Sequence, residues 1–201
     1  AQLKTEIQSF SHRTDIAGQL DSFIEFAYGR LNAKLRIAGQ ETILAVTPVN
    51  GQIDLPADFL QSRSLTRAWA GGQGFYELTS IGKSEAGLYG PGSGLSAVYV
   101  EESGIITVYP ASDAEHTLTY YARIPIPTTT DVFLTEYPDM VLDACLEQVC
   151  KWEADKQGRL DNRASWMGQA DDANAEHKRR RLGSRARAAR PSRASHAARA
   201  T

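Results

Sequence analysis

The sequence predicts an α+β protein in which helices at both ends of the chain bracket a β domain. Apolar residues recur every three or four positions near the two ends, whereas the middle alternates and is divided by Gly and Pro turns. The last 24 residues contain nine Lys or Arg and no Asp or Glu, so they are too polar to form a core of their own. We therefore predict a helical bundle that brackets an antiparallel β sandwich or barrel-like insertion, followed by an extended basic C-terminal tail.

The N-terminal region predicts a short helix over residues 3–10 and a longer one over residues 16–37. Apolar side chains in the longer segment are spaced at three and four positions, as on one face of an α-helix. Thr14 or Asp15 is placed to cap its start, and Gly39 is placed to end it.

The middle of the chain predicts short strands separated by turns. Asn50 and Gly51 both accept positive φ angles, which favours a type I′ turn and a hairpin between residues 42–47 and 52–55. One helical turn is expected over residues 84–88. Short strands at a spacing of roughly ten residues are typical of a small sandwich or barrel. Further strands are expected over residues 64–69, 75–79, 95–100, 105–109 and 117–122.

After Pro138 the helical period returns and predicts a strong helix, an interruption near Gly158, and a second helix that ends near Arg181. Trp166 and Met167 lie in the second helix. Core packing is the favoured role for both side chains, and apolar anchoring of a partner is the alternative.

These patterns divide the chain into four segments. The 201 residues, 42% of them hydrophobic, suffice for one domain with an appendage. The segments are the N-terminal helices of the helical domain over residues 1–40, the β insertion over residues 41–130, the C-terminal helices over residues 131–181, and the extended basic tail over residues 182–201.

The charge of the chain is strongly divided. The whole chain has 22 basic and 24 acidic residues, but nine of the basic residues lie after His177, so the body is acidic and the tail is basic. A tail of this composition is expected to be ordered only on an anionic surface outside its own core. A partner, rather than a small substrate, is therefore the first expectation. The alternative is a solvated tail that binds no partner and keeps the protein soluble.

Targeting signals and cysteine chemistry are not evident in the sequence. No apolar run approaches the roughly 18 residues of a membrane span, and the first residues lack the order of a signal peptide, so we expect a protein kept in the cytosol, or built into an assembly there, without a membrane partner. Cys145 and Cys150 are five positions apart in a helical pattern, which points them to different sides of the helix. We expect two core residues, with neither a disulfide nor a zinc pair.

Motifs for nucleotide binding are incomplete. Gly82-Lys83-Ser84 resembles the end of a phosphate-binding loop, but the required Gly five positions earlier is replaced by Glu77, whose charge would repel phosphate. A surface turn is the better interpretation of this triplet, and no cofactor is expected.

Catalytic and metal-binding patterns are also missing. The four histidines are scattered, and no Ser lies in a nucleophile-elbow pattern. Asp139, Asp143 and Glu147 step by four along one helical face, and such a stripe is expected to be solvated or to form a contact surface. We therefore expect no metal site and no enzymatic activity.

Several short motifs follow the long N-terminal helix in a fixed order. They are Leu-Pro-Ala-Asp-Phe at residues 55–59, Ile-Thr-Val-Tyr-Pro at residues 106–110, Tyr-Tyr-Ala-Arg-Ile-Pro at residues 120–125, and Tyr-Pro-Asp at residues 137–139. With these motifs, residues 20–156 resemble the head-to-tail adaptor proteins of tailed bacteriophages, also called connector or head completion proteins, which include tail tubular proteins.

The resemblance implies a structural protein of the virion, located at the head–tail junction and assembled in the host cytoplasm. It implies a homo-oligomeric ring, commonly of twelve subunits, that lies below the portal protein, seals the DNA channel and docks the next tail or nozzle protein. The partners implied are the portal protein, the neighbouring adaptor subunits and that downstream tail component. The helical part would form the ring wall, and the β insertion would form a collar or a platform for tail proteins.

Two sets of residues are candidates for these contacts. The basic tail either lies in an acidic groove of the portal, which we favour, or contacts DNA phosphates in the channel without sequence specificity. The candidate portal-binding residues are Arg179, Arg180, Arg181, Arg185, Arg187, Arg190 and Arg193. The candidate residues for binding the tail component lie in exposed Gly-rich loops. They are Gly71, Gly72, Gly74, Gly90, Gly92 and Gly94.

Two other classes of protein fit parts of the sequence. A nucleic-acid-binding protein would use the basic C-terminal arm and would bind DNA as a monomer in a salt-sensitive way. A small-ligand-binding β-barrel with helical flanks would have a closed apolar pocket and no ordered tail.

Overall fold

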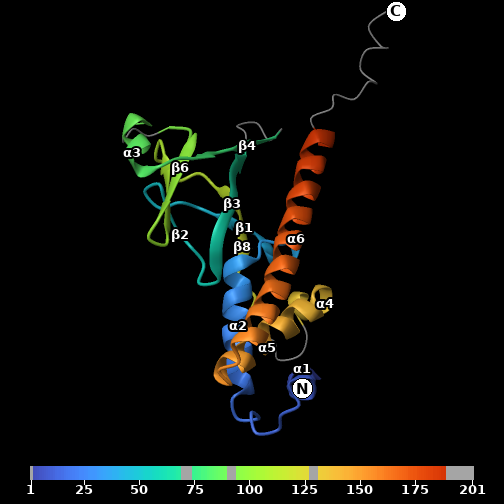
Figure 1. Ribbon diagram of the computed structural model, residues 1–201. Coiled ribbons are helices and arrows are strands. Elements are labelled where there is room, and N and C mark those ends of the chain that lie inside the picture. Colours follow the sequence, from blue (N-terminus) through green and yellow to red (C-terminus); the bar gives the residue numbers. More distant parts are fainter. Residues whose placement is uncertain (1, 69–73, 90–93, 127–130, 189–201) are drawn as a thin grey trace, which may run out of the picture. The chain divides into compact units, whose positions relative to one another are not determined.

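The computed structural model describes residues 2–68, 74–89, 94–126 and 131–188, and the chain divides into two compact units (Figure 1). We name Ala1–Ala38 together with Ile126–Thr201 the helical unit, and Gly39–Pro125 the β unit. The β unit is thus inserted between the two halves of the helical unit. The predicted α+β class is confirmed.

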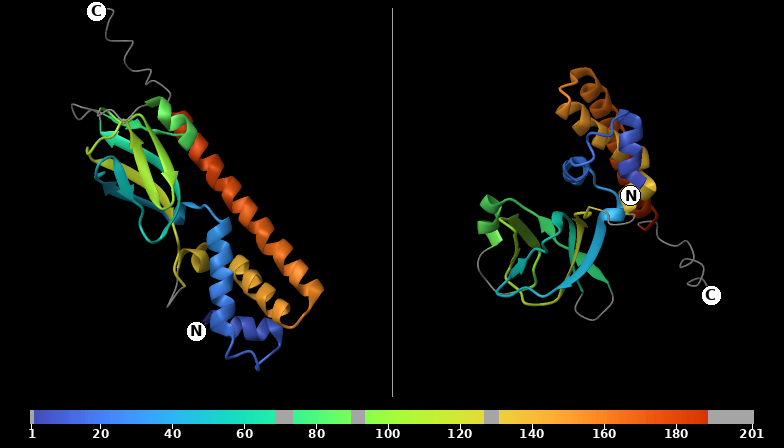
Figure 2. Two further views of the ribbon diagram at one scale, coloured as in Figure 1. Left: turned by 90° about the vertical axis from the view of Figure 1, so that its left-hand side faces the viewer. Right: turned by 90° about the horizontal axis from the view of Figure 1, so that it is seen from below.

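The helical unit is built from amphipathic helices, which Figure 2 shows from two further sides. Pro138 begins α5 at a position where its missing N–H costs no hydrogen bond. Ala154 has a φ of 61° and separates α5 from α6, four residues before the predicted interruption at Gly158. The helices are α1 (Gln2–Ser11), α2 (Leu20–Lys34), α4 (Val132–Glu136), α5 (Pro138–Trp152) and α6 (Lys156–Ala188).

The second helix is shorter than the sequence predicted, and its predicted caps are wrong. Asp15 does not cap it, because Arg13 binds the Asp15 carboxylate, with 2.8 Å between Arg13 Nε and Asp15 Oδ1. Gln19 stands at the N-cap without a side-chain hydrogen bond, and Leu35 ends the helix in an extended conformation before Gly39 is reached.

The core of the helical unit lies where α2, α4 and α6 pack on α5. Tyr28 of α2 contacts Phe133 of α4, with 5.8 Å between ring centroids. Burial of such side chains stabilises the unit by roughly 1.5–3 kcal/mol each. Besides Tyr28, the most buried apolar residues of α2, α4 and α5 are Ala27, Leu31, Phe133, Met140, Val141, Ala144, Cys145 and Val149.

The β unit consists of two four-stranded sheets. In the first sheet the order is β1 (Glu41–Val46), β8 (His116–Ala122), β3 (Phe59–Ala68) and β4 (Phe75–Glu77), all antiparallel. In the second sheet the order is β2 (Gln52–Asp54), β7 (Ile105–Tyr109), β6 (Val98–Glu102) and β5 (Thr79–Ser80), with β5 parallel to β6. A short helix, α3 (Lys83–Ala86), follows β5 near the predicted helical turn.

The turn at Asn50-Gly51 forms as predicted, but the predicted hairpin is wrong. Both residues have positive φ, 53° and 75°, as a type I′ turn requires. The flanking strands nevertheless belong to different sheets, since β1 pairs with β8 and β2 pairs with β7. The turn therefore passes the chain from one sheet to the other, and the pairing is set by distant residues.

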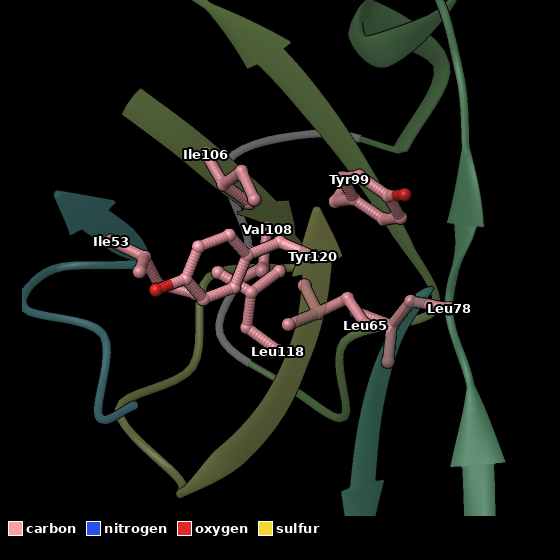
Figure 3. Close-up of a cluster of buried hydrophobic side chains, with 8 residues drawn as sticks. All are labelled: Ile53, Leu65, Leu78, Tyr99, Ile106, Val108, Leu118 and Tyr120. Carbon is pink, nitrogen blue, oxygen red and sulfur yellow. The ribbon is translucent and has the colours of Figure 1, made fainter. Parts of the chain in front are cut away.

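The two sheets share one hydrophobic core, shown in Figure 3. Leu78 lies at the point where the chain crosses between the sheets, because its N–H bonds to Leu65 of the first sheet and Thr79 begins the strand of the second. The described strands thus form a sandwich of two separate sheets, and no continuous ladder closes them into a barrel. The core residues are Ile53, Leu65, Leu78, Tyr99, Ile106, Val108, Leu118 and Tyr120.

The final helix continues past its predicted end near Arg181. α6 extends to Ala188, so the prediction of an extended tail is wrong for residues 182–188. Ala, Arg and Leu are strong helix formers, and this propensity extends the helix through a segment that charge alone marked as a tail. The rest of the predicted tail, residues 189–201, lies outside the described residues.

Candidate functional site

A buried carboxylate fixes α6 on the rest of the helical unit. Glu147 of α5 is 2% exposed and accepts a hydrogen bond from Trp166 Nε1 of α6 at 2.7 Å. Arg30 of α2 forms an ion pair with the same carboxylate at 2.5 Å, and its guanidinium lies 5.7 Å from the centroid of the Trp166 ring. One carboxylate therefore holds three helices together. The preferred role for Trp166, core packing, is confirmed.

A second carboxylate of α5 also faces α6. Asp143 accepts hydrogen bonds from Ser165 Oγ at 2.6 Å and from Gln169 Nε2 at 3.1 Å. Of the predicted acidic stripe, only Asp139 is exposed, while Asp143 and Glu147 form the contact with α6. The stripe is a contact surface within the helical unit rather than a solvated face.

A third polar contact fixes α6 against the end of α2. Asn174 accepts a hydrogen bond from the backbone N–H of Arg36 at 2.7 Å, and its Nδ2 donates to the carbonyl of Lys34 at 3.1 Å. The latter satisfies one of the carbonyls that a helix end leaves without an intrahelical partner. Side chains of the helical unit therefore fix the position of α6 from its start to residue 174.

The basic C-terminal part of α6 follows this fixed segment. Arg179, Arg180 and Leu182 are exposed, the last by 59%, and Arg181 is half-buried. Arg180 forms an ion pair with Glu176 at 2.5 Å, and both line a cavity of about 260 Å³ with Tyr137. Arg185 and Arg187 belong to α6, whereas Arg190 and Arg193 lie outside the described residues.

The Gly-rich loops are described only in part. Gly74 has a φ of 130° and precedes the exposed Phe75, and Gly94 lies against the ring of Pro110. Apolar side chains flank the second loop, with Leu88 86% exposed and Leu95 65% exposed. Gly71, Gly72, Gly90 and Gly92 lie outside the described residues.

Sequence reasoning missed an apolar groove between α2 and α5. The groove has a volume of about 400 Å³ and is lined by Phe23, Phe26, Gln148 and Trp152, with Lys151 and Arg30 also contributing. Phe26 is 62% exposed and Trp152 is 49% exposed. The available signal was that apolar residues on α2 cover more of the helix surface than a single packing face needs.

The cysteines offer no reactive thiol. Burial raises the pKa of the Cys145 thiol to about 12, and burial together with the nearby carboxylates of Asp155 and Glu153 raises the pKa of Cys150. Both thiols therefore stay protonated at neutral pH, and protonated thiols are poor nucleophiles and metal ligands. Cys145 is buried in the core, as predicted, whereas Cys150 is only half-buried.

Among the described residues, no group of three or more His, Cys, Asp or Glu side chains is arranged to hold a metal ion. None of the helices in this part of the chain combines the length and the apolar character needed to cross a membrane.

Exposed basic and apolar surfaces carried by rigid elements are features of a protein that acts through contacts with other macromolecules. Comparison with family models supports this class, because the model described as SU10 adaptor protein matches residues 1–195. The chain belongs to this family of phage head-to-tail adaptors, which confirms the resemblance seen in the sequence. No curated protein matches the chain significantly.

Membership of this family gives the chain a structural adaptor role in the virion. It also implies association with other components of the phage head and tail.

Proposed function

We propose that the chain forms a ring below the portal protein, seals the DNA channel and docks the next tail component. The C-terminal part of α6, with Arg179, Arg181, Arg185 and Arg187, binds an acidic groove of the portal. The exposed loops of the β unit next to Gly74 and Gly94 contact the tail component.

The observation that carries this proposal is the division of α6 into a fixed part and an exposed basic part. The contacts of Glu147, Asp143 and Asn174 hold the helix up to residue 174. A helix of 33 residues is about 50 Å long, so its last turns continue well beyond these contacts. A rigid helix presents its arginines at lower entropic cost than a flexible tail would.

Arginine suits an acidic protein groove better than a channel that releases DNA. Its planar guanidinium binds a carboxylate with two parallel hydrogen bonds and keeps its charge when partly buried. DNA phosphates would require only positive charge, and every cation bound to them would resist DNA movement. The portal groove is therefore the preferred site for the basic segment.

The proposal is tested by the mass of the purified protein, alone and mixed with its portal ring. The full chain is compared with a shortened chain that ends at Glu176 and lacks the basic segment. We expect the full chain to join the portal ring and the shortened chain to bind at least tenfold more weakly.

A matched pair of variants separates charge from geometry. Replacing Arg179, Arg181, Arg185 and Arg187 with Lys keeps the charge, whereas replacing them with Gln removes it, and both residues preserve helix propensity. If these arginines bind an acidic groove of the portal, both variants should bind the portal more weakly than the unmodified chain, because Lys lacks the bidentate fork of Arg. If neither chain binds the portal while the full-length monomer binds DNA in a salt-dependent way, the nucleic-acid-binding alternative replaces the adaptor ring.

A further inference from the structure

The first sheet of the β unit has two edges without a strand partner among the described residues. β1 pairs only with β8, and β4 pairs only with β3. Natural edge strands commonly carry Lys, Pro or inward-pointing charges that prevent pairing with another chain. Here β1 contains one charged residue, Glu41 at its start, which forms an ion pair with Arg63 of β3, and β4 contains one, Glu77 at its end. In an antiparallel pairing with Ala45 opposite Phe75, Glu77 lies opposite Ile43 rather than Glu41, so the two carboxylates are not directly opposite each other.

Both edges expose large apolar side chains. On β1, Ile43 is 73% exposed and Leu44 is 38% exposed. On β4, Phe75 is 74% exposed and Tyr76 is 42% exposed. Strands of three and six residues with this much apolar surface are unusual unless another surface covers them.

The strand register assigns these side chains to matching faces. Leu44 lies opposite Leu118 of the core, so Leu44 is on the core side of the sheet and Ile43 is on the outer side. Tyr76 of β4 is paired with Arg67 of β3, and Arg67 is paired with His116 of β8. His116 is two residues from Leu118 on the same strand, so all these side chains lie on the side of the sheet that Leu118 occupies.

Tyr76 is therefore also on the core side, and Phe75 is on the outer side. Each edge thus offers one apolar side chain to the outer face and one to the core face. Side chains on the same face of paired strands contact each other across the strands.

The strand directions also match. The four strands alternate in direction from β1 to β4, so β1 and β4 of one copy are antiparallel. We propose that β1 of one subunit pairs with β4 of the next, so that this sheet continues between neighbouring copies. The antiparallel alternation of strand directions then continues from one subunit to the next. Ile43 and Phe75 lie on the outer face of the shared sheet, and Leu44 and Tyr76 lie on its core face. This inference rests on the ring of the proposed function.

A ring favours this pairing over pairing of two β1 edges. A contact between two copies of β1 is self-complementary and stops at a dimer, whereas a ring needs two different patches on each subunit. The three residues of β4 also limit the contact to far less than the roughly 1,600 Å² of a typical stable complex. The edges therefore pair only where other contacts already hold subunits side by side, and the isolated protein does not dimerise through them.

The test is disulfide trapping in the ring assembled on the portal. Ala45→Cys and Ile43→Cys are each combined with Phe75→Cys, because all three side chains lie on the outer face. The matched control combines Leu44→Cys with Phe75→Cys, which places the two thiols on opposite faces. All variants carry Cys150→Ser, and the remaining native cysteine, Cys145, is fully buried.

We expect oxidation of at least one outer-face pair to give a ladder of covalent species longer than a dimer, at least tenfold more abundant than in the control. Dimers formed by Ala45→Cys alone would show β1–β1 pairing and overturn the proposal. A ring without covalent ladders would overturn the pairing but leave the adaptor ring intact. If the unmodified chain forms no ring on the portal, the proposed function fails, and the pairing fails with it.

A second measurement does not depend on thiol geometry. Phe75→Lys should leave the unfolding of the monomer unchanged within about 0.5 kcal/mol, because surface substitutions rarely exceed this value. The same change should weaken ring assembly at least fivefold. Unchanged assembly would overturn the proposal.

Discussion

The helical unit and the β unit are held together by different kinds of contact. Between α5 and α6, buried or half-buried polar side chains such as Glu147 and Asp143 form hydrogen bonds of defined length. The core cluster of the β unit contains aliphatic side chains and two tyrosines. Hydrogen bonds require particular distances and directions, whereas apolar burial is non-directional. The polar contacts therefore specify one position of α6 along α5, and the apolar core supplies stability without such a constraint.

This difference suits the roles proposed above for the two units. A helix that carries a partner-binding segment must have a fixed position along its axis, because a shift of one turn moves that segment by about 5.4 Å. A β unit that contacts neighbouring subunits needs a stable core and accessible edges. The predictions that follow test whether each unit depends on its own kind of contact.

The largest expected effect tests the apolar core. Leu118→Ala removes a fully buried side chain from the centre of the cluster and should destabilise the β unit by about 3–5 kcal/mol. Urea unfolding measures this loss, and hydrogen exchange shows in which unit it occurs. Ile43→Ala, on the paired strand but 73% exposed, is the control and should cost less than about 0.5 kcal/mol. Equal losses in the two variants would contradict the central role of the cluster.

The next effect tests the polar contacts of the helical unit. Glu147→Ala leaves the buried Trp166 N–H without an acceptor and removes the partner of Arg30, so a loss of about 2–4 kcal/mol is expected. The lower part of this range allows for Arg30, which is partly exposed to solvent. Glu147→Gln keeps an acceptor for Trp166 and should lose less. If Gln costs as much as Ala, the charge rather than the hydrogen bond is the important contribution.

Local periodicity predicted the elements better than their pairing. The strand Ile105–Tyr109 was predicted with its observed bounds, because alternation and the flanking Gly104 and Pro110 define it locally. The partner of β1 was not predictable in this way. β8 lies some 70 positions further along the chain, and the preference of Asn50-Gly51 for a turn does not determine which strands pair.

The candidate site was predictable in chemistry but not in detail. Composition identified the basic segment, yet its continuation as helix to Ala188 depends on propensity that the charge pattern obscured. The acidic stripe could not be assigned to a helix interface, because its partners Ser165 and Gln169 are polar, and charge spacing alone does not distinguish a solvated face from a contact surface. The groove at Phe26 and Trp152 was missed, because periodicity does not distinguish a packed face from an exposed one.

A smaller effect concerns the turn that connects the two sheets. Gly51 has a φ of 75°, and a Cβ at this position would lie 2.9 Å from the Cβ of Ala111. Gly51→Ala should therefore destabilise the β unit by about 1–3 kcal/mol through backbone strain and this close contact. Asn50→Gly is the control, because Gly accepts the φ of 53° at that position without strain, and it should change stability by less than about 0.5 kcal/mol. Thermal unfolding of the three proteins decides between these outcomes.

The smallest effect is a pH dependence that belongs to the β unit alone. His116 is 1% exposed, its Nδ1 donates to the carbonyl of Ala114 at 2.6 Å, and burial lowers its pKa below the ordinary value, with the nearby Arg67 lowering it further. The unfolded chain therefore binds this proton more readily than the folded chain, so stability falls as the pH drops through the unfolded pKa of about 6.5.

Between pH 7 and pH 6 this histidine can account for at most about 0.7 kcal/mol of lost stability. His116→Asn keeps a donor near the position of Nδ1 and does not titrate, so the difference in urea midpoint between the two proteins should grow in favour of the variant as the pH is lowered. A constant difference across this range would show that His116 keeps its ordinary pKa. The apolar core would then tolerate the charge, and the contrast with the polar contacts of the helical unit would be weaker than the structure indicates.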